Sequence, residues 1–202
     1  MTRSELISLL LSAEDKPQNS IITQRNLPWA ENASAAPSAA VLIGLVPEGD
    51  AWNILLTRRS EHLRFHGGQI SFPGGMVEPE DSNLAATALR ETREETGVPE
   101  NAWQVVRKQP LCRVRNGTLV MPVLAVADSP PVYTPNPDEV AEIFHLPLSH
   151  ALDIDRYGSR PFTYQGRHMQ VPTLPYRHYD IWGATAAMLY QLAESVPHPS
   201  RA

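Results

Sequence analysis

The sequence predicts an α/β protein built on a mixed β-sheet with helices on both faces. Short β-prone apolar runs occur before and after one strongly acidic helical segment, and a second helical pattern closes the chain. No internal repeat is visible. Strands that continue on both sides of a helix are typical of a sheet covered by helices. We therefore expect a layered α/β domain.

Composition limits the class of protein. The chain has 202 residues, of which 42% are hydrophobic and 19% charged, which is enough for one well-buried domain. A formal net charge of −5 argues against sequence-independent binding to nucleic acid. No apolar run approaches the ~20 residues of a membrane span. Cys112 is the single cysteine and the N-terminus lacks a signal-peptide pattern, so we expect a soluble cytoplasmic protein.

The first 38 residues are expected to form a helix and an arm that pack on the domain. Residues 4–11 are rich in Leu and follow a cap at Thr2 or Ser4, which fits a short amphipathic helix. Residues 16–38 are rich in Pro, Asn, Ser and Ala, as in a surface arm or linker. The main domain then spans residues 39–196, and residues 197–202 form a tail.

Six strands and one further hairpin are predicted in the domain. Residues 39–46 and 52–57 are apolar runs joined by Pro47-Glu48-Gly49-Asp50, whose Pro and Gly are typical of a hairpin turn. A short strand is expected at 70–72. Further strands are expected at 103–107, 118–126 and 140–146, a polar hairpin at 160–173, and a closing helix at 181–196. The 118–126 run is the most apolar, so we expect it to be central.

The segment GGMVEPEDSNLAATALRETREETGV, residues 74–98, places two glycines before the acidic helix. Positions three and four apart share a helix face, so Glu91, Glu94 and Glu95 point the same way. Small and apolar residues occupy the adjoining arc, and we expect the acidic side to face outward. The helix is expected to begin at a cap on Asp81 or Ser82 and to end at Gly97.

Three carboxylates on one helical face suit a hard cation such as Mg²⁺, which prefers oxygen ligands and binds phosphate oxygens as well. A metal held there can polarise a phosphoryl oxygen and activate a water molecule. For an acidic helix taken alone, a solvated face with salt bridges is the commoner explanation. The longer pattern around it favours the metal site.

That pattern resembles the Nudix box. Its second half is matched by Arg90, Glu91, Glu94, Glu95, Gly97 and Val98. In the first half, Gly75 and Asp81 take the places of the usual Gly and Glu with one additional residue before the arginine, and Thr92 replaces an apolar residue. The preceding stretch LLTRRSEHLRFHGGQISFPGG, residues 55–75, resembles a signature of the Nudix coenzyme A diphosphatases.

The resemblance implies a Nudix-type α/β/α sandwich over residues 39–196. It also implies metal-dependent hydrolysis of the diphosphate of coenzyme A or a derivative, giving 4′-phosphopantetheine and adenosine 3′,5′-bisphosphate. One alternative is another nucleoside diphosphate derivative, such as ADP-ribose or a dinucleotide, or a nucleoside triphosphate. A remote alternative is a non-catalytic module that binds a nucleotide.

The roles of individual residues follow from the same resemblance. Glu91, Glu94 and Glu95 are expected to bind Mg²⁺ or Mn²⁺, with one of them acting as general base. Arg90 is expected to pair with one of these glutamates and orient it. Asp81, at the shifted position of the box Glu, and Glu139 are second-tier candidates; Glu139 is included because Nudix enzymes often recruit a carboxylate from a later loop. For Glu139, and for the nearby Glu142, an acidic strand edge is the commoner explanation.

Cations just before the box are expected to bind the phosphates of a coenzyme A-like substrate. Arginine matches phosphate through its bidentate fork, and we place Arg59 first among the candidates. The full set of expected substrate-binding residues is Arg58, Arg59, Arg64, His66, Gly68, Gln69, Gly74 and Gly75. Arg58 and His62 could equally be solvated. A homodimer through the 16–38 arm or the closing helix is compatible with the sequence.

Overall fold

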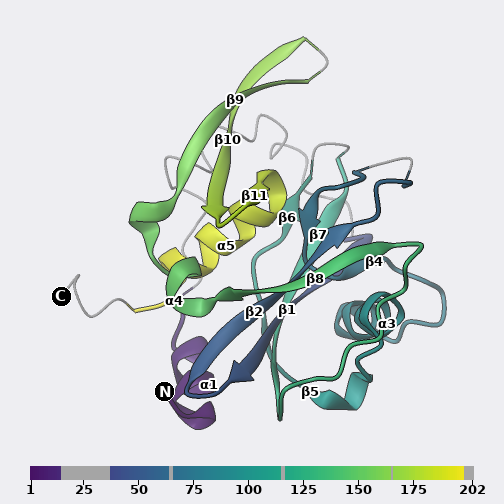
Figure 1. Ribbon diagram of the computed structural model, residues 1–202, viewed down its shortest axis with the longest axis vertical. Helices are drawn as coiled ribbons and strands as arrows, with labels where there is room; N and C mark the ends of the chain where they lie inside the picture. The colour runs from purple at the N-terminus through teal and green to yellow at the C-terminus, as the bar shows by residue number, and fades with distance from the viewer. Residues whose placement is uncertain (15–36, 64–65, 115–116, 165, 198–202) are drawn as a thin grey trace.

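The computed structural model describes residues 1–14, 37–63, 66–114, 117–164 and 166–197. Within these residues the chain forms a mixed eight-stranded sheet with helices on both faces, and a smaller three-stranded sheet beside it (Figure 1). The predicted α/β class and the mixed sheet are therefore confirmed. No helix of the described segments is long and apolar enough to cross a membrane.

The large sheet has the strand order β3-β2-β1-β7-β5, with β4 paired to β1, β6 to β7 and β8 to β2. Its strands are β1 Ala39–Glu48, β2 Ala51–Arg59, β3 Ile70–Ser71, β4 Gly74–Met76, β5 Trp103–Lys108, β6 Cys112–Arg113, β7 Leu119–Ala127 and β8 Val140–Pro147. β1 and β7 run parallel, and the remaining pairs are antiparallel. β7 lies between β1 and β5, which confirms the central position predicted for this apolar run.

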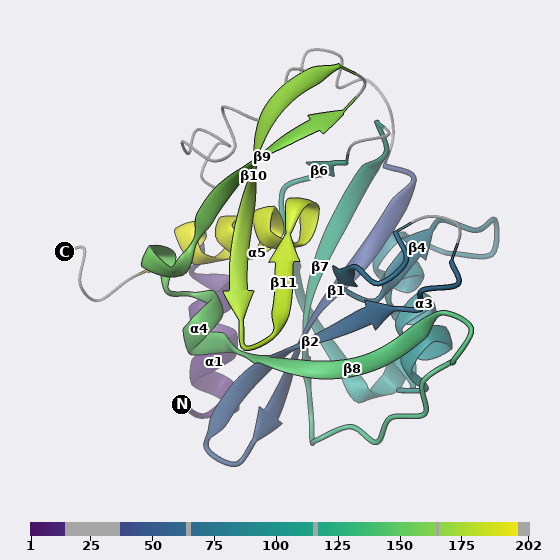
Figure 2. The same ribbon diagram turned by 45° about the horizontal axis from the view of Figure 1, so that its top comes forward.

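Two apolar clusters fix the helices on opposite faces of the sheet. The helices are α1 Arg3–Leu11, α3 Leu84–Thr96, α4 Leu148–Ala151 and α5 Gly183–Ser195, with 3₁₀ turns at Glu100–Ala102 and Ile154–Arg156. α3 buries Ala88 in one cluster with Leu42, Leu55 and Val123. α1 and α5 pack into the other cluster, and Figure 2 shows them together on the far side of the sheet from α3.

The C-terminal part of the chain differs from the prediction at one boundary. The strands β9 Gly158–Tyr164, β10 Arg167–Tyr176 and β11 Tyr179–Trp182 form an antiparallel sheet in the order β11-β10-β9. The closing helix was expected from Ile181, but Ile181 and Trp182 belong to β11 and α5 begins at Gly183. Tyr179 and Ile181 are buried and Asp180 is exposed, which is the alternation of a strand.

Both ends of the described chain are anchored on the domain. Thr2 caps α1 in a capping box with Glu5, and Leu6 and Leu10 are buried. The Glu14 amide donates to the Ser195 carbonyl at the end of α5. Most of the expected 16–38 arm and of the 197–202 tail lies outside the described residues.

The start of α3 corrects another expectation. The N-cap is Asn83, and not Asp81 or Ser82, because Asn83 Oδ1 accepts from the amides of Ala85 and Ala86 at 2.9 and 3.3 Å. The C-terminal end agrees with the prediction, since Gly97 caps the helix in the left-handed region at φ +77°.

Candidate active site

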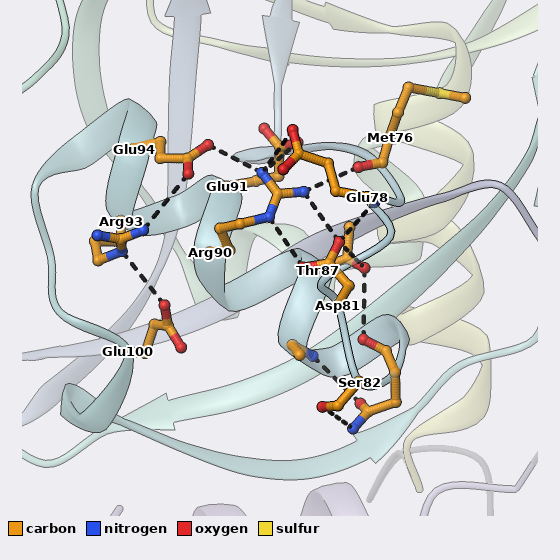
Figure 3. A network of polar contacts seen from close by, with 12 residues as sticks. Met76, Glu78, Asp81, Ser82, Thr87, Arg90, Glu91, Arg93, Glu94 and Glu100 are labelled. Atoms are coloured by element: carbon orange, nitrogen blue, oxygen red, sulfur yellow. Dashed lines mark hydrogen bonds and ion pairs between the residues drawn. The ribbon is translucent and has the colours of Figure 1, made fainter.

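Arg90, in the middle of α3, is the centre of a polar network that joins the helix to the loop before it (Figure 3). Its Nε and Nη2 donate to the two carboxylate oxygens of Asp81 at 3.0 and 3.1 Å, and Nη2 also donates to the Met76 carbonyl. Its Nη1 donates to Glu91 Oε1 at 3.1 Å and to Glu94 Oε2 at 3.0 Å. The Arg90 hydrogen bonds hold the pKa of Asp81 well below its usual range. Arg90 therefore ties the loop before the helix to two box glutamates.

The three box glutamates differ in burial, which corrects the expectation that the acidic side faces outward. The side chain of Glu94 is 44% exposed, that of Glu91 15% and that of Glu95 2%. Glu95 Oε1 lies 3.7 Å from Arg59 Nη1, while Oε2 is buried and has no hydrogen-bond partner in the described part of the chain. Only Glu94 behaves as a surface residue.

Burial sets the charge state of this group. Desolvation raises the pKa of Glu95 to about 8, against the partial compensation of Arg59 and with further raising by Glu139 and Glu91. Desolvation likewise raises the pKa of Glu91, which Arg90 opposes. Arg90 and Arg59 lower the pKa of Glu91 and Glu95, respectively, but by less than burial and the neighbouring carboxylates raise it.

Gly74 and Gly75 let the chain pass between β1 and α3. At Gly75 a Cβ would overlap the carboxylate of Glu91, so only glycine admits that side chain against the backbone. Gly74 has φ +153°, and a Cβ there would meet the backbone of β1 at Ala40 and Val41. A side chain at either position would therefore displace a neighbouring element.

The loop between β7 and β8 brings a fourth carboxylate to the site. The Thr134 amide donates to the Thr96 carbonyl at 2.8 Å, and the Asn136 amide donates to the Glu95 carbonyl at 3.0 Å. Asn136 Nδ2 donates to Glu139 Oε1 at 3.3 Å. These contacts tether the loop to the C-terminal end of α3 and place Glu139 where its charge raises the pKa of Glu91 and Glu95, after desolvation.

Asn136 is a residue of the site that the sequence reasoning missed. Its Oδ1 accepts from the Asp138 amide at 3.1 Å, and its carbonyl accepts from the Glu139 amide at 3.1 Å. An Asn that bonds the backbone two residues on forms an Asx turn, and Asn-Pro-Asp-Glu in a Pro-rich loop was a signal for such a turn.

The expected substrate-binding residues separate into two groups. Arg59 points toward Glu95, whereas Arg58 pairs with Glu142, at 3.1 Å between Nε and Oε2. Glu142 is therefore engaged outside the glutamate cluster. The Gly68 amide donates to the Arg59 carbonyl, and the Arg59 amide donates to the Gln69 carbonyl, which folds the loop back on β2.

Two other predicted residues of this loop have different outcomes. His66 is exposed and its Nδ1 lies 2.8 Å from Gln69 Oε1, so these two side chains are brought together. Arg64 lies outside the described residues. Cys112 packs against the apolar cluster below α1 and α5, and burial raises the pKa of its thiol to about 12, in agreement with a structural role.

The donor set fits a divalent cation. A buried carboxylate oxygen without a partner, beside two further carboxylates that raise its pKa, is stabilised in its charged form by a cation. Among the described residues, no three His, Cys, Asp or Glu side chains already enclose a point that could hold an ion. Glu91 and Glu94 each accept from Arg90 through one oxygen, which leaves a second oxygen of each carboxylate as a possible ligand for an ion.

Residues 36–165 match the family model of the NUDIX domain. The chain belongs to the NUDIX family. It is a Nudix hydrolase, a pyrophosphohydrolase of nucleoside diphosphate derivatives, and enzymes of this family generally use divalent metal ions and act on small molecules.

Two relatives agree with this assignment. The chain is 39% identical over 158 residues to a protein of Photorhabdus laumondii described as an uncharacterized Nudix hydrolase, NudL, covering 78% of this chain and 84% of the relative. A NudL of Yersinia pestis (strain Pestoides F) is 37% identical over the same length, 79% of the relative.

Two solved structures are similar to this chain. The Nudix hydrolase RenU from M. smegmatis has a TM-score of 0.49 and 25% identity, covering 58% of this chain and 74% of that one. The NUDIX domain of Shewanella oneidensis NrtR, complexed with ADP ribose, has a TM-score of 0.46 and 20% identity, covering 75% and 87%.

Proposed function

We propose that this hydrolase cleaves the diphosphate of coenzyme A or a derivative into 4′-phosphopantetheine and adenosine 3′,5′-bisphosphate. The observation that carries the proposal is the signature at residues 55–75, which begins in β2 and ends at the site. It delivers Arg59 to Glu95 at one end and Gly75 to Glu91 at the other. The signature thus contacts a box glutamate near each of its two ends.

The proposal assigns separate roles in metal binding, diphosphate binding and proton transfer to the residues of the site. Glu91, Glu94 and Glu95 would hold Mg²⁺ or Mn²⁺, which when bound neutralises diphosphate charge and acidifies a coordinated water. Arg59, near Glu95, supplies a guanidinium to the diphosphate. Glu139, placed beside the box glutamates, is a carboxylate able to accept a proton from the attacking water. Asp81 fixes Arg90, which orients Glu91 and Glu94.

Hydrolysis of coenzyme A tests the substrate. We expect purified protein with Mg²⁺ or Mn²⁺ to convert coenzyme A into the two named products, separated by chromatography. ADP-ribose, a dinucleotide and a nucleoside triphosphate are assayed in parallel. Efficient turnover of one of these without turnover of coenzyme A would overturn the substrate assignment, and hydrolysis of none would favour a non-catalytic module.

Glu94→Gln tests the metal site, because Glu94 is the exposed box carboxylate and its loss disturbs packing least. We expect activity to fall by about a hundredfold or more, since a charged ligand is removed while the fold is kept. Glu100→Gln is the matched control, since Glu100 is exposed and pairs only with Arg93 at 3.3 Å among the described ion pairs. Full activity of Glu94→Gln would contradict the metal assignment.

Two proposals concern the whole protein. A cytoplasmic location follows from the single cysteine and is tested by cell fractionation. For a homodimer, α5 offers little surface, because its apolar residues, including Leu189 and Leu192, are buried in the core. The 16–38 arm is left as the expected contact, and light scattering with and without that segment measures its effect on mass.

A further inference from the structure

A second polar cluster lies on the face of β2 opposite Glu95, among Arg58, Glu142 and Tyr179. Glu142 accepts from Tyr179 Oη at 2.7 Å and from Arg58 Nε at 3.1 Å. The Tyr179 hydrogen bond and then that of Arg58 lower the pKa of Glu142, so this group stays a carboxylate. The Glu142 carboxylate therefore holds both the Arg58 guanidinium and the Tyr179 phenol in place.

The turn between β10 and β11 adds two basic side chains to this cluster. Arg177 and His178 form the turn and both are exposed. Burial and the Glu142 hydrogen bond raise the pKa of Tyr179, and the charges of Arg177 and Arg58 oppose that rise, so both cations lie near its hydroxyl. Figure 2 shows the β10–β11 turn next to β8, the strand that carries Glu142.

Three rings stack from the core to the surface at the same place. Phe144 and Tyr179 are parallel, with centroids 3.6 Å apart and planes at 6°. His178 lies over Tyr179 at 4.0 Å and 37°. Phe144 and Tyr179 are buried, and the stack ends in the exposed ring of His178. An exposed ring on a rigid stack is a suitable platform for a nucleobase.

The backbone of the turn is held in an uncommon conformation. Arg177 has φ +54°, and His66 has φ +60°; in the described segments they are the non-glycine residues with positive φ. His66 lies in the loop that follows Arg58 and Arg59. Arg177 lies two residues before Tyr179, which shares Glu142 with Arg58. Such conformations persist where surroundings fix them and occur often at binding sites.

We propose that Arg58, Arg177 and His178 form a subsite for an adenosine 3′-phosphate. The inference rests on the proposed function and names the part of coenzyme A that this surface takes. The two guanidinium groups bind the phosphate and the His178 ring stacks on adenine. Arg59, across the same strand end, faces the diphosphate.

Both guanidinium groups have donors to offer. Among the residues that the structure describes, Arg58 makes, beyond its Nε bond, only a long contact of 3.7 Å from Nη1 to the exposed Glu61. Arg177 lies over the Tyr176 ring at 5.1 Å, and in the part of the chain that is described no carboxylate comes within ion-pair distance of it. A phosphate monoester accepts several hydrogen bonds from such forks.

Arg177→Gly tests the subsite without endangering the fold, because glycine adopts the positive φ of this position readily. The measurement is KM for coenzyme A and for 3′-dephospho-coenzyme A, which lacks only the phosphate in question. We expect Arg177→Gly to raise KM for coenzyme A about tenfold and to leave that for dephospho-coenzyme A within about twofold. Arg156→Ala, at an exposed ion pair with Asp153, is the control and should change neither.

Equal effects on the two substrates, or no effect on either, would overturn the subsite while leaving the proposed function intact. If the protein hydrolyses neither substrate, the proposed function fails, and calorimetry without metal tests the subsite alone. The wild-type protein should then bind adenosine 3′,5′-bisphosphate more tightly than adenosine 5′-monophosphate, and Arg177→Gly should abolish that preference. Indifference of the wild-type protein to the 3′-phosphate would refute the assignment.

His178→Ala tests the platform separately. Loss of base stacking should weaken the binding of adenosine 3′,5′-bisphosphate and adenosine 5′-monophosphate by a similar factor, about fivefold, because adenine is common to both. His168→Ala, an exposed histidine on β10, is the matched control. Unchanged affinity for both nucleotides in His178→Ala would remove His178 from the subsite.

Discussion

At the scale of residues, burial separates side chains of the same chemical type. Glu94 and Glu95 are adjacent in sequence, yet their exposed fractions are 44% and 2%. Arg58 and Arg59 are adjacent as well, and they serve opposite faces of the sheet through Glu142 and Glu95. Two adjacent arginines thus belong to two different polar clusters, one on each face of the sheet.

The raised pKa of Glu95 predicts that the metal-free protein becomes less stable to unfolding as pH rises. The pKa is about 8 in the folded protein against an ordinary 4.5, so the stabilising contribution of the protonated group is complete below pH 4.5. It is lost as pH rises to 8. The reason is that ionising the buried carboxylate requires desolvating its charge.

Glu95→Gln measures this effect by urea unfolding in EDTA between pH 5 and 8. The variant cannot ionise, so we expect its stability relative to wild type to increase with pH. The gain approaches a few kcal/mol at pH 8, from ~1.4 kcal/mol per unit of pKa shift. A difference between the two proteins that stays constant with pH would contradict the raised pKa.

At the scale of elements, the loop between β7 and β8 acts as a brace between α3 and Glu139. Its amides close on the carbonyls of Thr96 and Glu95. A Cβ at Gly97 would collide with Thr134, so the helix cap and the loop are packed in contact. Glu139 is thereby held against the helix by contacts distributed along the loop.

Asn136→Ala should loosen Glu139 without removing it. We expect kcat to fall about tenfold with KM nearly unchanged, because the substrate contacts are elsewhere while the carboxylate loses its orienting hydrogen bond. The pH profile of kcat should shift as well, which a purely structural defect would not produce. Asn101→Ala, on the exposed 3₁₀ turn, is the control, and loss of activity confined to KM would argue against a positioning role.

Much of the secondary structure could be predicted from the sequence, because the strong signals are local. The run at 118–126 is apolar enough to identify a central strand, and Gly97 marks a helix end by its backbone freedom. β4 was missed because it consists of Gly74, Gly75 and Met76, which lack β-prone side chains. Ile181 and Trp182 were assigned to the helix because the apolar spacing there fits the period of a helix as well as that of a strand.

The sequence identified which residues gather at the site better than it predicted their burial and their partners. The box resemblance identified the glutamates and Arg90, but periodicity alone equates acidic residues with solvent, so the burial of Glu95 was not foreseen. Asp81 was considered as a cap, whereas its partner is Arg90, nine residues on. The pairing of Glu142 with Arg58 joins strands β8 and β2, and no local pattern reports such a contact.

At the scale of the whole molecule, the proposed metal site at the glutamate cluster predicts that metal binding stabilises the folded protein. A ligand that binds only the folded protein stabilises it by about 2.7 kcal/mol at a hundred times its Kd. For a domain of this size we expect Mn²⁺ to raise the melting temperature by roughly 5–10 °C. Differential scanning calorimetry with Mn²⁺ and with EDTA measures the shift.

The Glu94→Gln variant is the control for this shift, since it lacks one of the proposed ligands and should respond much less to Mn²⁺. Glu100→Gln should respond as the wild-type protein does. An equal shift in all three proteins would mean that the ion stabilises the fold from some other place.

The parallel pairing of β1 with β7 also governs when the active site can form during synthesis. Ala39 pairs with Val120, and β2, α3 and β5 are all made between them. The sheet centre cannot close until β7 has left the ribosome, because parallel strands far apart in sequence must wait for the later one. Glu139 follows β7 in the chain, so the last carboxylate of the site is also made only after the strand that closes the sheet centre.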